Sequence, residues 1–267
     1  MKTAYFYLAL PLVILSCTAQ NNQPNNKSTS QTIIDLSHDY SEETVYWVTE
    51  EGFKLDTAFK GITDKGYYYT ANSFKSAEHG GTHLDAPIHF AEGRQSVDEI
   101  PLEKLIGSAI KVDVSDQAAN SPDYLISVED LMAWEKEHGQ IPENSIILLY
   151  TGHSKYYPDL IQYLGTDHKG ADAIKELHFP GLSPEAAEWI VKNRNINAIG
   201  IDTPSIDYGQ STLFESHVSL LSENIPVFEN LASLEQLPAS GFEVIALPMK
   251  IKKGSGGPLR IIALVNE

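Results

Sequence analysis

The sequence is poor in cysteine: Cys17 is the only one among 267 residues. A lone cysteine cannot form an internal disulfide bond. If Cys17 is consumed by modification, the folded part of the chain has no thiolate to offer. Any metal ion would then have to be bound by histidine, aspartate or glutamate.

Positive charge is also scarce. The chain has 19 lysine and arginine residues against 36 aspartate and glutamate residues, a formal net charge of −17, and its basic residues form no cluster. Such an acidic surface repels phosphate backbones, so we predict no nucleic-acid partner. The hydrophobic fraction of 42% and the charged fraction of 21% are typical of a folded globular protein.

Long hydrophobic runs are lacking as well. The apolar run at residues 4–15 follows a short positive start and is too short to span a bilayer comfortably, which is typical of a signal peptide. It ends at Ile14-Leu15-Ser16-Cys17, which resembles a bacterial lipobox, where the cysteine is acylated and becomes the first mature residue. We therefore predict a signal peptide at 1–16, a lipidated Cys17 and a place in the bacterial cell envelope, periplasmic or on the outer surface. An uncleaved anchor or an ordinary signal peptidase site is the alternative.

The remaining chain divides into a tether and one domain. Residues 17–31 carry the cysteine and a polar stretch typical of a flexible tether, whereas 32–267 show no repeat and no internal linker. Helical patterns alternate with apolar strands, which favours an α/β fold, and the last two strands predict a C-terminal hairpin. Strands are expected at 32–36, 110–114, 145–150, 197–201, 242–250 and 258–265, and helices at 127–139 and 183–194.

Residues 40–76 are rich in aromatic side chains and contain several glycines. This composition suits strands and loops better than helices. The aromatic side chains would either line a pocket for a flat ring or belong to the core, and the sequence leaves both interpretations open.

Four residues with metal-ligand chemistry share odd numbers: His79, His83, Asp85 and His89. In an extended chain alternate side chains point to one face, so all four could converge. The glycine pair between His79 and His83 adds backbone freedom for a bend. Imidazole nitrogens and a carboxylate suit Zn²⁺, Mn²⁺ or Fe²⁺, so the segment predicts a divalent-metal site, with ordinary loop histidines as the alternative.

The full segment, His79-Gly-Gly-Thr-His83-Leu-Asp85-Ala-Pro-Ile-His89, resembles the signature of the cyclase-like metal-dependent hydrolases. That family includes bacterial kynurenine formamidase and isatin hydrolase. Further similarity runs from Asp35-Leu-Ser-His through Phe179-Pro-Gly-Leu-Ser and residues 200–207 to the C-terminal strands, so it covers nearly the whole domain. The resemblance implies a swivelling β/β/α fold with a mixed sheet, a divalent metal, and a homodimer or homotetramer.

The resemblance also assigns roles to residues. It implies that His79, His83 and Asp85 bind a first metal ion and that His89 is the acid/base. In the formamidase branch a second ion is held by the shared aspartate, a histidine and a glutamate twelve residues further on. His217 and Glu229 stand at that spacing, so the site resembles the branch with two ions, Zn²⁺ or Mn²⁺, rather than the isatin-type branch, which lacks the carboxylate.

Together these features predict a metal-dependent hydrolase of an amide or related carbonyl bond in a small molecule, such as an N-formyl aryl amine or an isatin-like cyclic amide. A metal-activated water would attack the carbonyl, with His89 moving the proton. The alternative is a non-catalytic, lipid-anchored protein that binds a metal or a small molecule. A histidine beside the ligands that is free to transfer protons disfavours this alternative, because binding alone needs no proton transfer.

Other polar residues carry weaker signals. Asp202, Ser205 and Asp207 follow a buried strand, where ligand crevices form in α/β folds, although the same residues also serve as turn-bonding groups. Asp35 is similar. The histidines of the stretch 152–180, namely His153, His168 and His178, are interpreted as surface or loop residues.

Overall fold

The computed structural model describes residues 1, 2 and 31–266. The predicted signal peptide after its first two residues, Cys17, and all of the tether except its last residue therefore lie outside the described residues. Within the described part of the chain, no helix combines the length and the apolar character needed to cross a bilayer.

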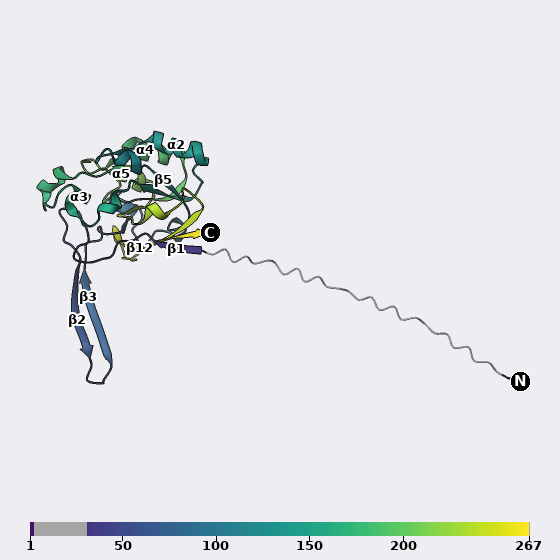
Figure 1. Cartoon of the computed structure of the whole chain (residues 1–267), viewed down its shortest axis with the longest axis horizontal. Helices are drawn as coiled ribbons and strands as arrows, with labels where there is room; N and C mark the ends of the chain where they lie inside the picture. Colours follow the sequence, from purple (N-terminus) through teal and green to yellow (C-terminus); the bar gives the residue numbers. More distant parts are fainter. Residues whose placement is uncertain (3–30, 267) are drawn as a thin grey trace.

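A mixed β-sheet that closes on itself forms the centre of the molecule (Figure 1). Its strand order is β1-β12-β11-β5-β7-β9-β10-β4, and β12 also pairs with β4. Seven strands therefore form a closed ring, and β1 pairs with β12 outside it. The strands are β1 (Gln31–Asp35), β4 (His83–Asp85), β5 (Ile106–Asp113), β7 (Ser145–Tyr150), β9 (Ile196–Ile201), β10 (Val227–Glu229), β11 (Phe242–Pro248) and β12 (Gly256–Asn266).

The strand directions confirm the predicted α/β class with a mixed sheet. β5, β7, β9 and β10 run parallel to their neighbours in that order. β11 and β12 pair antiparallel from Phe242 opposite Val265 onwards, which is the predicted C-terminal hairpin.

The central strands are apolar on both faces because each face packs against a different core. In β7, Ile146 and Leu148 point into the barrel core, whereas Ile147 and Leu149 point into the core beneath the helices. All four are fully buried. Burying one such side chain contributes about 1.5–3 kcal/mol relative to leaving it exposed, so the two-sided apolar pattern stabilises the whole layered structure.

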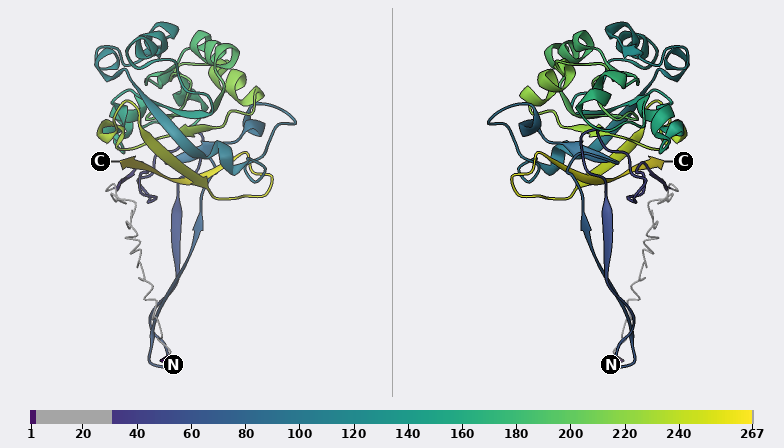
Figure 2. Two further views of the ribbon diagram at one scale, coloured as in Figure 1. Left: turned by 90° about the vertical axis from the view of Figure 1, so that its right-hand side faces the viewer. Right: turned by 90° about the vertical axis from the view of Figure 1, so that its left-hand side faces the viewer.

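Helices cover the outer face of the parallel strands (Figure 2). The predicted N-caps are confirmed: the Ser127 hydroxyl accepts from the Asp130 N–H at 3.2 Å in a capping box, and the Ser183 hydroxyl accepts from the Ala186 N–H at 3.1 Å. The helices are α1 (Ser115–Ala118), α2 (Val128–His138), α3 (Leu160–Leu164), α4 (Pro184–Asn193) and α5 (Glu215–Ser222), and a small separate sheet pairs β6 (Leu125–Ile126) with β8 (Gly181–Leu182).

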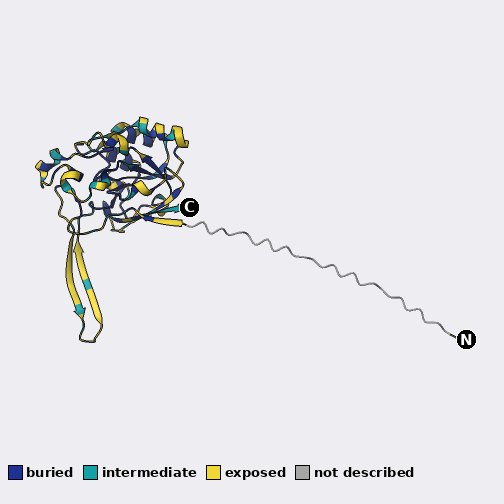
Figure 3. Ribbon diagram, viewed as in Figure 1, coloured by how far each residue is buried: buried dark blue, intermediate teal, exposed yellow. Residues whose placement is uncertain are grey.

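A two-stranded hairpin of β2 (Lys54–Ile62) and β3 (Tyr68–Lys75) projects away from this body (Figures 1 and 2). Almost its entire surface is exposed (Figure 3). The aromatic residues of the stretch 40–76 therefore include three kinds of position: Tyr46 is buried, Trp47 lines a cavity, and those of the hairpin face solvent.

The stretch 152–180 folds against the body and partly contradicts the prediction made for its histidines. His168 and His178 are exposed, as expected, and contact Glu176 and Asp123. His153, however, is buried, and its Nε2–H donates to the Tyr163 carbonyl at 2.8 Å. Interpreting His153 as a surface residue was wrong because this segment folds inward over the ring of Tyr163, 5.0 Å away.

Candidate metal centre

The segment that carries the predicted ligands is not one extended strand. Only His83 and Asp85 lie in a strand, β4, and His89 ends a short 3-10 helix over Pro87–His89. Gly81 turns the chain with a φ of 56°, a conformation that favours glycine. The shared odd numbering is therefore the right argument for His83 and Asp85 alone, although the folded chain still brings His79 and His89 to the same place.

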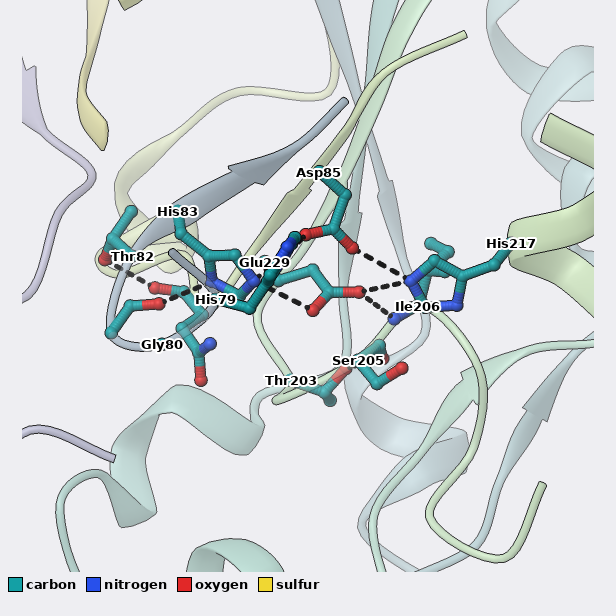
Figure 4. Close-up of polar contacts among 12 residues, drawn as sticks. His79, Gly80, Thr82, His83, Asp85, Thr203, Ser205, Ile206, His217 and Glu229 are labelled. Atoms are coloured by element: carbon teal, nitrogen blue, oxygen red, sulfur yellow. Dashed lines mark hydrogen bonds and ion pairs between the residues drawn. The ribbon is translucent and has the colours of Figure 1, made fainter. Parts of the chain in front are cut away.

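Two further predicted ligands arrive from distant parts of the chain (Figure 4). His217 lies in α5, and Glu229 ends β10. β10 pairs antiparallel with β4, so Glu229 stands directly opposite His83. Residues opposite each other in a sheet present their side chains on the same face, which explains how a short strand pair delivers three of the polar groups.

Asp85 lies between the histidines. Its Oδ1 is 2.6 Å from His79 Nδ1 and 3.1 Å from His83 Nε2, and its Oδ2 is 2.9 Å from His217 Nε2. Glu229 completes the cluster, with Oε1 3.2 Å from His217 Nε2 and Oε2 3.5 Å from His83 Nε2. Three imidazole nitrogens thus face two carboxylates from both sides (Figure 4).

In each of these histidines, the ring nitrogen that faces away from the carboxylates also has a polar partner. His83 Nδ1–H donates to the Gly81 carbonyl at 2.9 Å, and His217 Nδ1 contacts Asp207 Oδ2 at 2.6 Å. His79 Nε2 contacts the Ser255 hydroxyl at 2.8 Å. A histidine that donates its outer N–H to such an acceptor presents a lone pair inward, which is the arrangement typical of metal-binding histidines.

Three of the supporting residues carried no signal in the sequence. The Ser255 hydroxyl donates to Glu78 Oε2 at 2.6 Å, so Glu78 orients the group that holds His79. At Gly256, a Cβ would lie 2.6 Å from His79 Cε1, so a side chain there would displace the ring. Because β12 lies beside β4 only after the barrel closes, local patterns near His79 give no sign of these contacts.

The remaining polar candidates divide by position. Asp207 supports His217, and Ser205 lines the cavity above the cluster. Asp202 accepts from the N–H groups of Thr151 and His153, so its role is structural turn bonding. Asp35 is at the barrel surface, where it pairs with Arg260 at 2.6 Å.

The electrostatics of the cluster fit a cation. Burial and the neighbouring Asp85 carboxylate raise the pKa of Glu229. Burial would also raise the pKa of Asp85, but the surrounding histidines hold it well below its usual range. Two fully buried carboxylates beside three nitrogens form a donor set of the kind that binds a divalent cation, whose charge their two negative charges offset.

His89 differs from the three supported histidines. Its ring stacks on His79, with the centroids 3.9 Å apart, and its ring nitrogens make no hydrogen bond within the described chain. Burial lowers the pKa of His89 to about 4, although the Asp85 carboxylate opposes this shift. Two groups of three residues bring one ligand atom each, an imidazole nitrogen or a carboxylate oxygen, within 4.8 Å of one another. The groups are His79, Asp85 and His89, and His83, Asp85 and Glu229.

A cavity of about 460 Å³ opens above the cluster. The metal-ligand candidates and His89 form its polar part, and the rings of Trp47, Phe90 and Phe214 line it as well. Phe90 stacks on His217 with centroids 4.5 Å apart, so one wall of the cavity also restrains a ligand candidate. The cavity thus joins a charged end to apolar walls, which is the usual construction of a small-molecule site.

A closed mixed barrel that holds this donor cluster beneath an aromatic cavity is the arrangement expected of a metal-dependent hydrolase. The chain belongs to the cyclase family: the family model described as "Putative cyclase" matches residues 34–208.

The names of similar proteins agree with this assignment. The chain is 32% identical to an isatin hydrolase of Roseibium aggregatum, over 76% of this chain and 77% of that protein. It is 28% identical to a kynurenine formamidase of Salinibacter ruber, over 86% of this chain and 96% of that protein.

Solved structures show the same architecture. Isatin hydrolase A from Labrenzia aggregata, bound to benzyl benzoate, superposes with a TM-score of 0.81 at 33% identity and covers 90% of this chain and 96% of that one. An isatin hydrolase bound to the product analogue thioisatinate superposes with a TM-score of 0.80 at 27% identity, over 90% of this chain and 94% of that one.

The contact behind His217 gives a first prediction. Replacing Asp207 by asparagine removes the charge that holds the His217 ring, so we expect affinity for the divalent metal to fall about 10- to 100-fold. Competition with a coloured chelator measures the change. Asp123→Asn is the matched control, since Asp123 contacts His178 at 2.8 Å on the surface. Equal affinities for the two variants would show that Asp207 does not support a metal ligand.

Proposed function

We propose that this protein hydrolyses the amide C–N bond of a small aryl or cyclic amide. The observation that carries the proposal is the set of three histidines and two carboxylates at one end of an aromatic-lined cavity. Polar groups converge there with lone pairs available, while the rest of the cavity offers apolar surface to an organic substrate.

His79, His83 and Asp85 are proposed to hold one divalent ion, and His217 and Glu229 a second one, with Asp85 shared between them. The two oxygens of Asp85 face different histidines, which supports a bridging role. Zn²⁺ and Mn²⁺ both suit this donor set of nitrogen and carboxylate oxygen. When bound, such an ion supplies Lewis-acid chemistry by activating water and polarising a carbonyl.

His89 is proposed to move the proton. Its nitrogens are not engaged by other described side chains, and its ring lies against His79, so it reaches the space above the carboxylates. It would accept a proton from the attacking water and return it to the leaving nitrogen, so that the amide C–N bond breaks while the new C–O bond is retained. Such acid/base help contributes roughly 10²- to 10⁴-fold in rate.

The cavity walls favour a flat, aromatic acyl or amine group. Trp47 and Phe214 lie edge-on to each other with centroids 6.4 Å apart, and Phe90 lies 5.3 Å from Phe214. Aromatic pairs in this geometry accept a third ring against their faces or edges. The relatives are named isatin hydrolase and kynurenine formamidase, and one solved isatin hydrolase holds the product analogue thioisatinate, which supports a small aryl or cyclic amide as the substrate class here.

The function is tested with a substrate panel. We expect the metal-loaded chain to hydrolyse isatin or an N-formyl aryl amine, and to lose turnover when a chelator removes the metal. Lactones and cyclic imides without an aromatic ring serve as comparison substrates, and metal content per chain is measured on the same sample. A metal-loaded protein that binds an aryl amide without turning it over would instead support the non-catalytic binding protein.

Variants separate the ligands from the proton-transfer group. We expect Asp85→Ala or His83→Ala to lose metal and activity together, because each removes a central donor. His89→Ala should keep its metal but turn over roughly 10²- to 10⁴-fold more slowly. Elemental analysis and steady-state kinetics on the three variants give the answer. Loss of metal from His89→Ala would make His89 a ligand and leave the proton to another group.

The cellular location of the protein is a separate proposal. We propose that Cys17 is acylated and that the lipid alone holds the protein in the bacterial cell envelope, since the tether that follows it is polar. Cys17→Ser should then abolish labelling of the chain by a fatty-acid probe. Labelling of the serine variant equal to that of the unchanged chain would show that Cys17 is not the acylated residue.

A further inference from the structure

The metal cavity carries more negative charge than its metal cluster uses. Asp85 and Glu229 lie buried among the histidines, and the wall also includes Glu50, which is exposed, and Glu78, which is half-buried. Among the described residues that line the cavity there is no lysine or arginine. The metal cluster and the proton-transfer group therefore do not account for the charge of the two outer carboxylates.

Glu78 already has partners. The N–H and the hydroxyl of Ser255 both donate to Glu78 Oε2, at 2.9 Å and 2.6 Å, and the same hydroxyl contacts His79 Nε2 at 2.8 Å. The charge of Glu78 is thus directed at the group that orients a ligand candidate. This carboxylate helps to build the metal cluster and is not free to bind a ligand in the cavity.

Glu50 has no comparable partner. Within the described part of the chain, its carboxylate makes no hydrogen bond and no ion pair, although its side chain lines the cavity. Glu51, the next residue, differs because its Oε2 pairs with Lys75 Nζ at 2.6 Å. Of these two neighbouring acids, the one on the cavity wall is therefore the one whose negative charge has no cation beside it.

A tight turn of the backbone holds Glu50 close to Trp47. The Glu50 N–H donates to the Trp47 carbonyl at 2.9 Å. The indole ring of Trp47 packs edge-on against Phe179 and against Phe214, with centroids 6.4 Å apart in both pairs, so its position is restrained. A restrained aromatic ring and an unpaired carboxylate thus stand within one turn of chain on the same cavity wall.

These two groups suit one kind of ligand chemistry. A carboxylate attracts an ammonium group, and the face of an indole ring attracts the same cation through its quadrupole. A ligand carboxylate, in contrast, would be repelled by Glu50 and would find no basic side chain on the described wall. The cavity volume of about 460 Å³ accommodates a benzene ring with a short side chain next to the metal cluster.

We propose that Glu50 and Trp47 recognise a protonated amino group, so that the preferred substrate is an aryl amide with an aminoalkyl side chain and no carboxylate. The amide half of this substrate rests on the proposed hydrolase function. Recognition of the amine does not depend on turnover, because it uses residues that lie outside the metal cluster. Glu50 determines specificity in this scheme, and proton transfer stays with His89.

A matched substrate series tests the preference in the metal-loaded protein. Formanilides whose ring carries an aminoethyl, a hydroxyethyl or a carboxyethyl group differ in the charge at the end of the side chain. We expect kcat/KM for the aminoethyl compound to exceed that for the hydroxyethyl compound roughly 3- to 30-fold, the range of cation–aromatic contacts. The carboxyethyl compound should be the poorest of the three. Equal values for all three compounds would overturn the proposal.

The two neighbouring glutamates supply a variant and its matched control. Glu50→Gln removes the charge and keeps the shape, so it should lower the ratio of aminoethyl to hydroxyethyl kcat/KM about 3-fold or more. Glu51→Gln removes a carboxylate that Lys75 already pairs, and should leave that ratio as it is in the unchanged chain. A ratio that falls equally in both variants, or in neither, would contradict a specific role for Glu50.

Ionic strength separates attraction between charges from selection by size. Glu50 is exposed, so dissolved salt screens its charge. The preference for the aminoethyl compound should therefore shrink as the Debye length falls from about 30 Å in 0.01 M salt to about 3 Å in 1 M salt. A preference of the same size at both salt concentrations would show that the shape of the side chain is selected, which would overturn the proposal.

A ligand without an amide keeps this test separate from the test of the hydrolase function. Phenethylamine has the ring and the amine and cannot be hydrolysed, and phenethyl alcohol is its neutral counterpart. Calorimetry should show tighter binding of the amine to the metal-loaded protein, and Glu50→Gln should remove most of the difference. Turnover of neutral aryl amides without this selectivity would overturn recognition of the amine alone. Selective binding of the amine without turnover of any amide would support the recognition and overturn the hydrolase function.

Discussion

The burial of Asp85 and Glu229 side by side is the constraint on which the rest of the structure depends. Two carboxylates removed from water repel each other, so the fold tolerates them only with positive charge or donors between them. His83 and His217 face both carboxylates, and His79 faces Asp85. The histidines therefore make the burial of both carboxylates tolerable, and the same arrangement suits a cation.

Backbone geometry delivers this cluster with few residues. The antiparallel pairing of β4 with β10 sets Glu229 opposite His83, and the pairing of β4 with β12 brings Ser255 behind His79. The outward hydrogen bonds then fix each ring, so that the inward nitrogens are oriented before any ion binds. Preorganisation of this kind limits the rearrangement that metal binding requires.

Much of the fold follows from local patterns, whereas the details of the site do not. The apolar runs of β7 and β9 and the capping box at Ser127 predict their elements because each depends on nearby residues. The signature from His79 to His89 identifies the metal segment, whereas Glu229 is predicted as a ligand only through the family resemblance. Ser255 and Gly256 depend on how β12 meets β4, which is set by closure of the barrel.

The hairpin and His153 show the same limit from the opposite direction. The sequence of an aromatic-rich hairpin is similar whether the hairpin covers a core or projects from the body. The alternation shows that a strand has two faces but does not show what packs against them. Likewise, the composition around His153 describes a polar loop, and only the tertiary position of Tyr163 explains why the imidazole is enclosed.

β4 is three residues long, yet it is the strand that closes the ring between β10 and β12, and all three of its residues are buried. Two of those three are candidate ligands. The same three residues therefore close the barrel and supply two candidate ligands, so a substitution in β4 affects both the fold and the site. Trp47 and Phe214 line the cavity from outside the barrel strands, so a substitution there can change the cavity without opening the barrel.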